Sequence, residues 1–265
     1  MKFQEKLDKV VEKNKSLLCV GLDSNLAKIP EKFKKLANPQ LEFNKWVIEQ
    51  THDLVCAYKP NLAFYEMMGE KGMRDLKLTM EYLRKNYPEI CTIADAKRGD
   101  IGSTNEGYVK AVFDWLGFDA ITLHPYLGKE ALEPFLERKD KGLFILCRTS
   151  NPGAGEFQDL EIEGKRLWQK VAEQVRDEWN ENNNCMLVVG ATYPEELGEI
   201  RKMVGEMTLL VPGIGAQGGE VERTVKAGVN SKGRGMIINS SRGIIFSDNP
   251  RQAAKELRDE ISKYR

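Results

Sequence analysis

Residues 90–101 read ICTIADAKRGDI, an apolar run that ends in a dense set of charges. Its first half has the length and composition of a strand that is buried on both faces, as in a parallel sheet. Asp95 and Lys97 lie two residues apart, so on a regular strand their side chains share one face with that of Ile93. The stretch therefore predicts a buried strand whose carboxyl end carries an acid and an ammonium side by side.

Seven further apolar runs recur along the chain, and amphipathic stretches separate them. Eight strand–helix units in about 250 residues are typical of a TIM barrel. The sequence therefore predicts an α/β fold: a single (β/α)8 TIM-barrel domain over residues 1–265 with an extra N-terminal helix. A doubly wound open sheet is the alternative, because periodicity does not show that a sheet closes. The other apolar runs are 17–23, 57–64, 119–125, 143–149, 186–192, 209–215 and 235–242, and helices are expected near 41–54, 70–86, 103–116, 129–138, 163–181, 194–204, 219–227 and 250–262.

Composition and charge exclude several classes of protein. The 265 residues include 40 Lys plus Arg and 40 Asp plus Glu, and this balance argues against a nucleic-acid or membrane-surface partner, which needs a basic field. No apolar run approaches the ~18 residues of a membrane span, and residues 1–15 lack the apolar core of a signal peptide. We therefore expect a cytoplasmic protein, with five widely spaced cysteines that are reduced and mostly buried: Cys19, Cys56, Cys91, Cys147 and Cys185.

The strand ends carry the candidate catalytic residues, since TIM-barrel sites lie at the carboxyl face. Lys59 lies near the expected end of the second strand, and Asp100 follows just beyond the end of the third. Together with Asp95 and Lys97 they are expected to form a cluster in which ammonium and carboxylate groups alternate. Each ammonium next to a carboxylate then stays protonated, and each carboxylate stays ionised. A structural ring of ion pairs is the alternative. A lysine held protonated in this way can stabilise and protonate a carbanion, but it cannot readily form a Schiff base.

A phosphate site is expected at the last two strands. Residues 213–218 read GIGAQG and Arg242 ends the eighth run; loops after strands seven and eight are the usual phosphate site of TIM barrels. The glycine motif comes too late in the chain for a dinucleotide fingerprint. Asp23 is a candidate for binding ribose hydroxyls, with helix capping as the alternative. Ser150 lies on a Gly- and Pro-rich loop that could fold over a ligand, or it could simply serve the turn.

Taken together, these motifs resemble a known family. The run ADAKRGDIGSTNEGY at 94–108 resembles the Asp-x-Lys-x-x-Asp signature of orotidine 5′-phosphate decarboxylases, in particular their longer subfamily. The resemblance extends over the whole predicted barrel. Further matching segments follow in the family's order, namely GLDS at 21–24, YKPN at 58–61, TSNPGA at 149–154, PGIGAQGG at 212–219 and SSRG at 240–243.

The resemblance implies decarboxylation of orotidine 5′-monophosphate to uridine 5′-monophosphate without metal or cofactor. It implies that Lys97 protonates C6 and that Lys59, Asp95 and Asp100 complete the charge network. It also implies a homodimer with shared active sites, because Asp100 and Thr104 reach the neighbouring subunit's site. The substrate-binding residues that it implies are Asp23 for ribose, Ser150 for the pyrimidine, and Gly215, Gln217 and Arg242 for phosphate.

Two other functions stay open on the sequence alone. A related barrel that decarboxylates 3-keto-gulonate 6-phosphate shares the Asp-x-Lys-x-x-Asp element but uses Mg²⁺, and it carries an acid where this chain has Lys59. An ammonium there suits an anion site better than a Mg²⁺ site. A nucleotide-binding sensor without catalysis is the second possibility, since a complete residue set does not prove turnover.

Overall fold

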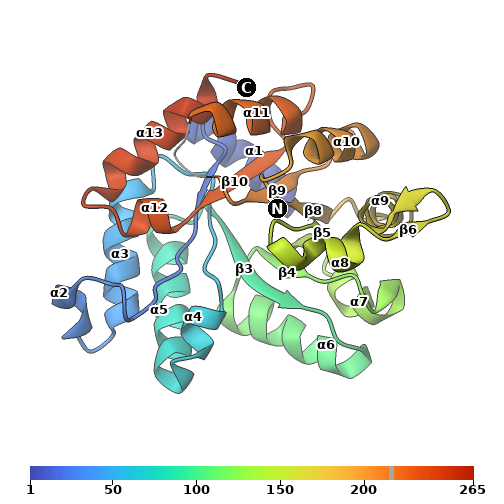
Figure 1. Ribbon diagram of the computed structural model, residues 1–265. Helices are drawn as coiled ribbons and strands as arrows, with labels where there is room; N and C mark the ends of the chain where they lie inside the picture. Colours follow the sequence, from blue (N-terminus) through green and yellow to red (C-terminus); the bar gives the residue numbers. More distant parts are fainter. Residues whose placement is uncertain (215–217) are drawn as a thin grey trace.

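Eight parallel strands close into a barrel in the computed structural model, which describes residues 1–214 and 218–265 (Figure 1). Around the barrel the strands follow the order β1-β10-β9-β8-β5-β4-β3-β2. This closure confirms the TIM barrel and excludes the open sheet. The strands are β1 (Leu18–Val20), β2 (Ala57–Tyr58), β3 (Cys91–Arg98), β4 (Ala120–Leu123), β5 (Gly142–Arg148), β8 (Cys185–Val189), β9 (Leu209–Pro212) and β10 (Met236–Ser240).

Helices surround these strands and bury their outer faces, which explains why the strands read as continuous apolar runs. Most of the helices lie where the amphipathic stretches of the sequence predict them. Short helical turns also follow several strands. The helices are α1 (Phe3–Asn14), α2 (Glu31–Lys34), α3 (Pro39–Thr51), α4 (Ala63–Glu66), α5 (Gly69–Asn86), α6 (Gly102–Val109) with its π-helical continuation (Lys110–Leu116), α7 (Gly128–Leu136), α8 (Gly155–Gln158), α9 (Leu167–Gln174) with a second π-helical turn (Val175–Trp179), α10 (Pro194–Val204), α11 (Gly218–Gly228), α12 (Arg242–Ile245) and α13 (Pro250–Ser262).

The extra N-terminal helix α1 packs on the amino-terminal end of the barrel. The Phe3 ring meets Phe144 of β5 edge-on at 5.7 Å between centroids, and both side chains are buried. Gly142 makes room for this contact, since a Cβ there would lie 2.6 Å from the Phe3 ring. Lys6 forms an ion pair with Asp119 at 2.7 Å. The helix thus covers the end opposite to the predicted site and leaves the carboxyl face open.

One predicted helix begins later than expected. The stretch 163–181 is helical only from Leu167, because residues before it form a hairpin of β6 (Glu161–Ile162) and β7 (Lys165–Arg166). The two turn residues, Glu163 and Gly164, have φ of 55° and 75°. Positive φ at both positions is the geometry of the tight hairpin turns that match strand twist. The turn residues therefore override the helical periodicity at this point.

The cysteine prediction is confirmed, since all five thiols are buried and free. Burial raises the pKa of Cys19 to about 12, so this thiol stays protonated at neutral pH. None of the described helices has both the length and the apolar character needed to cross a membrane.

Candidate active site

Three charged side chains meet at the carboxyl ends of β2 and β3. Asp95 accepts a hydrogen bond from the Lys59 ammonium, with 2.6 Å between Nζ and Oδ2. Its other carboxylate oxygen, Oδ1, accepts from Nζ of Lys97. The Lys59 side chain is only 5% exposed, whereas that of Lys97 is 50% exposed. The carboxylate therefore holds one buried and one accessible ammonium.

Mutual attraction keeps Lys59 and Asp95 charged. Burial alone would lower the pKa of Lys59, but the carboxylates of Asp95 and Asp23 outweigh it and hold that pKa above its ordinary value. Burial would likewise raise the pKa of Asp95, but the ammonium groups of Lys59 and Lys97 lower it to about 2. Asp95 is therefore a carboxylate at neutral pH. Lys59 is an ammonium there, which is unsuited to Schiff-base chemistry.

Asp95 and Lys97 meet through a bulge in β3. The register against β4 pairs Ala94 with Ile121 but Arg98 with Leu123, so β3 uses four residue steps where β4 uses two. Lys97 lies in this bulge with φ of 47°. The prediction that the two side chains meet is confirmed, but the regular alternation from which it was drawn is wrong here. A bulge re-aims a side chain in a way that the two-residue strand period does not describe.

Asp100 forms no ion pair with Lys59 or Lys97 of its own chain. Its place in the charge network, which the family resemblance assigns to the neighbouring subunit's site, stays a prediction. Its Oδ1 accepts from the backbone N–H of Ile101 at 2.8 Å, and it forms no ion pair with any residue in the described ranges. The side-chain oxygen of Asn105 accepts from the Asp100 N–H at 3.0 Å and ties the turn after β3 to α6. Thr104, in the first turn of α6, is exposed.

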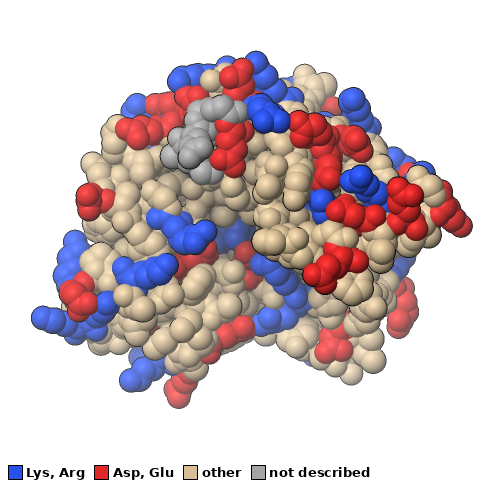
Figure 2. All heavy atoms as spheres, in the orientation of Figure 1, with Lys and Arg blue, Asp and Glu red and all other residues tan. Residues whose placement is uncertain are grey.

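A cavity of about 400 Å³ opens beside the trio, and we call it the charged cavity. Figure 2 shows a hollow at the centre of this face with basic and acidic atoms on its floor. One side of the cavity carries Lys59, Asp95 and Lys97, and Ser150 lies on the loop that borders it. The opposite wall is apolar and is formed by Leu146, Val188, Leu210 and Pro212. A flat ring with one charged edge fits such a lining.

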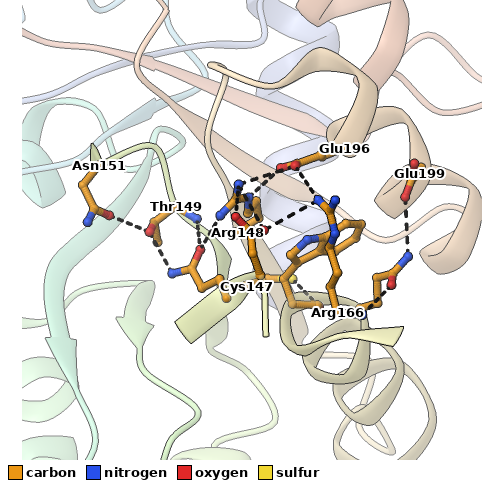
Figure 3. A network of polar contacts seen from close by, with 11 residues as sticks. Cys147, Arg148, Thr149, Asn151, Arg166, Glu196 and Glu199 are labelled. Carbon is orange, nitrogen blue, oxygen red and sulfur yellow. Dashed lines mark hydrogen bonds and ion pairs between the residues drawn. The ribbon is translucent and has the colours of Figure 1, made fainter. Parts of the chain in front are cut away.

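The loop that carries Ser150 is held by a network centred on Arg148, the last residue of β5 (Figure 3). The Arg148 side chain is 5% exposed, and its Nε donates to Oε2 of Glu196 on α10 at 2.5 Å. Gln158 of α8 lies next to it and binds Thr149 twice: its Oε1 accepts from the backbone N–H and its Nε2 donates to Oγ1, both at 2.9 Å. Thr149, the residue before Ser150, is thus held to α8 by two hydrogen bonds from one side chain.

A second cavity, which we call the arginine cavity, has a volume of about 860 Å³ and lies at the ends of β1, β9 and β10. Arg242, exposed at the start of α12, lines it together with Asp23, whose Oδ1 accepts from the Asn61 N–H at 3.3 Å. Asn239 of β10 also lines it, and its buried Oδ1 has no hydrogen-bond partner among the described residues. The expected phosphate residues Gly215 and Gln217 lie outside the described residues.

Comparison with known proteins identifies the family of this arrangement. The family model described as orotidine 5′-phosphate decarboxylase / HUMPS family matches residues 16–257, which is most of the chain. The chain belongs to the orotidine 5′-phosphate decarboxylase / HUMPS family. The expectation drawn from the sequence motifs is therefore confirmed, and the matched range contains every strand of the barrel.

Full-length relatives in this family share nearly half of their residues with the chain. Orotidine 5′-phosphate decarboxylase of Cellvibrio japonicus is 47% identical over 271 residues, which is 99% of this chain and 98% of the relative. The enzyme of the same name from Janthinobacterium sp. is 46% identical, covering 100% and 99%. The solved structure of Leishmania donovani OMP decarboxylase has a TM-score of 0.89 at 40% identity, covering 100% of this chain and 98% of that one.

The trio bears on whether this site suits an organic anion or a metal ion. Both carboxylate oxygens of Asp95 already bind lysine ammonium groups. A Mg²⁺ ion prefers carboxylate and water oxygens, and in the described part of the chain no group of three or more His, Cys, Asp or Glu side chains could hold a metal ion. The arrangement suits an organic anion better than Mg²⁺. Metal independence stays a prediction.

Some residues in and around the charged cavity could not be predicted as site residues from the sequence. Arg148 and Gln158 belong to no motif, and Glu196 follows Arg148 by 48 positions. Thr122 lies in the ordinary strand run DAITLHP and yet lines the charged cavity at 2% exposure. A hydroxyl among apolar strand residues was the available hint, but threonine is common in strands.

Proposed function

We propose that this chain catalyses the cofactor-independent decarboxylation of orotidine 5′-monophosphate to uridine 5′-monophosphate, the last step of de novo pyrimidine nucleotide synthesis. The observation that carries the proposal is the accessible ammonium of Lys97, bound to a carboxylate whose other oxygen is held by the buried Lys59. The family assignment over residues 16–257 supports the same reaction.

The reaction requires a positive charge next to C6 of the pyrimidine. When the bond from C6 to the carboxylate carbon breaks, CO2 leaves and the electron pair stays on C6, in the ring plane where the π system cannot delocalise it. The Lys97 ammonium stabilises this pair and then transfers a proton to C6, and the neutral amine regains a proton from solvent. Two unit charges 4 Å apart at an effective dielectric constant near 20 interact by about 4 kcal/mol, which corresponds to roughly three powers of ten in rate.

Asp95 and Lys59 keep the proton donor in place. The Asp95 carboxylate fixes the direction of the Lys97 ammonium, and Lys59 prevents Asp95 from taking up a proton by holding its pKa near 2. Fixed charges of this kind need no reorganisation during the reaction, and this is why preorganised sites are effective. Asp95 also lies where the substrate carboxylate would come close to it.

Binding of the rest of the substrate divides between the two cavities. Ser150 and the apolar wall of the charged cavity suit the pyrimidine ring. In the arginine cavity, Arg242 suits the phosphate, which a guanidinium binds with two parallel hydrogen bonds, and Asp23 suits the ribose hydroxyls. We infer that Gly215 and Gln217 complete the phosphate site. Binding energy from these remote groups can be used to lower the barrier at C6.

We further infer that the working form is a homodimer with shared active sites. Asp100 has no ionic partner among the described residues of its own chain, and its neighbours Ile101 and Thr104 are exposed, Ile101 at 61%. Tyr126 and Leu127, after β4, are exposed apolar side chains as well. This combination of unpaired acid and exposed apolar surface supports a contact with a second copy.

The five free cysteines support a reducing, cytoplasmic location.

A spectrophotometric assay tests the proposed activity. Purified protein is mixed with orotidine 5′-monophosphate, and the fall in absorbance of the orotate ring is followed while uridine 5′-monophosphate and CO2 are quantified. The proposal expects stoichiometric formation of both products. Binding of the nucleotide without turnover would instead identify a sensor, and turnover only with 3-keto-gulonate 6-phosphate and Mg²⁺ would identify the activity of the related sugar-phosphate barrel.

A further inference from the structure

Thr122 of β4 lies directly beneath the bulge that carries Lys97. Its Oγ1 accepts from the backbone N–H of Ala96 at 3.1 Å and from that of Lys97 at 3.0 Å. The same hydroxyl donates to Oδ1 of Asp95 at 3.2 Å. A hydroxyl has one proton and two acceptor lone pairs, so these three bonds use its whole capacity. Thr122 is 2% exposed and lines the charged cavity.

The bulge creates the need for this hydroxyl. Between the pairs Ala94–Ile121 and Arg98–Leu123, β3 has three residues where β4 has only Thr122. The Asp95 N–H donates to the Pro60 carbonyl at 3.1 Å, so the N–H groups of Ala96 and Lys97 are the ones that need partners on β4. A buried N–H without a partner is costly. Thr122 replaces the missing ladder partners with a side-chain oxygen.

The backbone of Lys97 also needs support. Its φ of 47° lies in the left-handed region, which a side chain with a Cβ rarely occupies unless the surroundings impose it. On the solvent side, Nη1 of Arg98 donates to the Ala96 carbonyl at 2.9 Å. On the buried side, Thr122 holds the two N–H groups. The conformation that directs the Lys97 ammonium to Asp95 is thus fixed from both sides.

We propose that Thr122 is a positioning residue for the reaction: its hydroxyl maintains the bulge of β3 and the orientation of the Asp95 carboxylate, and thereby places the Lys97 ammonium against C6. This inference rests on the proposed decarboxylation. It assigns a role to a residue outside the Asp-x-Lys-x-x-Asp element, on the neighbouring strand. Thr122 acts on Asp95 and Lys97 and leaves the arginine cavity unchanged, so its loss affects kcat and spares KM.

The test compares Thr122→Val, which removes the hydroxyl at nearly constant shape, with Thr122→Ser, which keeps it. The matched control is Thr92→Val. Thr92 is a buried threonine near the amino end of β3 whose Oγ1 likewise bonds a backbone N–H and a carboxylate, both of Asp119, at 3.1 and 2.9 Å. It supports the barrel at the opposite end from the trio.

We expect Thr122→Val to lower kcat by roughly 10- to 100-fold, the usual effect of losing hydrogen bonds to charged and buried groups. KM is expected to stay within about threefold, and Thr122→Ser and Thr92→Val to keep kcat within about threefold of the wild type. If the valine variant does not fold, Thr122→Ala, which also lacks the hydroxyl, takes its place against the serine variant.

A kcat of the valine or alanine variant equal to that of the serine variant would overturn the positioning role, as would an equal loss in Thr92→Val. Wild-type turnover is measured in the same series. Absence of turnover in the wild type would refute the proposed decarboxylation itself, and the two failures are therefore distinguishable.

Discussion

Replacing Asp95 with asparagine removes the charge at the centre of the trio and keeps the shape of the side chain. The pKa of Asp95 lies at about 2 in the folded protein, against an ordinary value of 3.8. Since each pKa unit corresponds to 1.36 kcal/mol, the charged carboxylate contributes about 2 kcal/mol to folding at neutral pH. Asp95→Asn should therefore lower the free energy of unfolding by about that amount at pH 7.

The pH dependence gives the sign of the effect. Because the folded-state pKa is below the unfolded one, the stabilisation is complete above about pH 4 and is lost as pH falls through 2. About half of it should persist at pH 3. The variant should thus approach the wild type in acid, as measured by urea unfolding at pH 7, 5 and 3.

The exposed pair of Asp53 with Arg251, at 2.7 Å, provides the control for this measurement. Both side chains are nearly half exposed, so Asp53→Asn should cost under about 1 kcal/mol. An Asp95→Asn variant as stable as the wild type at pH 7, or a loss that does not change between pH 7 and pH 3, would refute the electrostatic reasoning.

Three further predictions concern the substrate, the subunits and metals. Arg242→Ala should raise KM for orotidine 5′-monophosphate by roughly 10- to 100-fold through loss of charge-assisted hydrogen bonds to phosphate; an unchanged KM would place the phosphate elsewhere. Equal amounts of inactive Lys97→Ala and Asp100→Ala protein, mixed and allowed to exchange subunits, should regain about a quarter of the wild-type activity, because half of the dimers then carry one intact site; no recovery would contradict shared sites. Dialysis against EDTA should leave turnover unchanged, and a loss restored by Mg²⁺ would favour the metal-dependent chemistry of the related sugar-phosphate barrel.

The general plan of this site could be predicted from the sequence for a simple physical reason. Parallel strands of a closed barrel end at the same face, so charges at the ends of separate apolar runs must converge there. Lys59, Asp95 and Lys97 belong to this class, and their side chains do meet. Arg242 and Asp23 likewise line one cavity although they lie at opposite ends of the chain.

The details of the site depend on register and turns, which a pattern of residue types does not contain. The bulge in β3 exists only relative to β4, so neither the φ of Lys97 nor the role of Thr122 could be predicted from either strand alone. The bond from the Asp100 N–H to Asn105 ties the turn after β3 to α6, and the spacing of residues along the strand does not predict it. The Arg148–Glu196 pair joins two distant segments, and local periodicity carries no information on such a contact.

The central claim is that the Lys97 ammonium supplies the charge and the proton on which decarboxylation depends, and its most direct test is the turnover of Lys97→Met. Methionine keeps much of the side-chain volume and removes the charge. We predict that kcat falls by at least about a thousandfold, while the affinity for uridine 5′-monophosphate, measured by calorimetry, stays within about tenfold. Turnover of the methionine variant within tenfold of the wild type would contradict the claim.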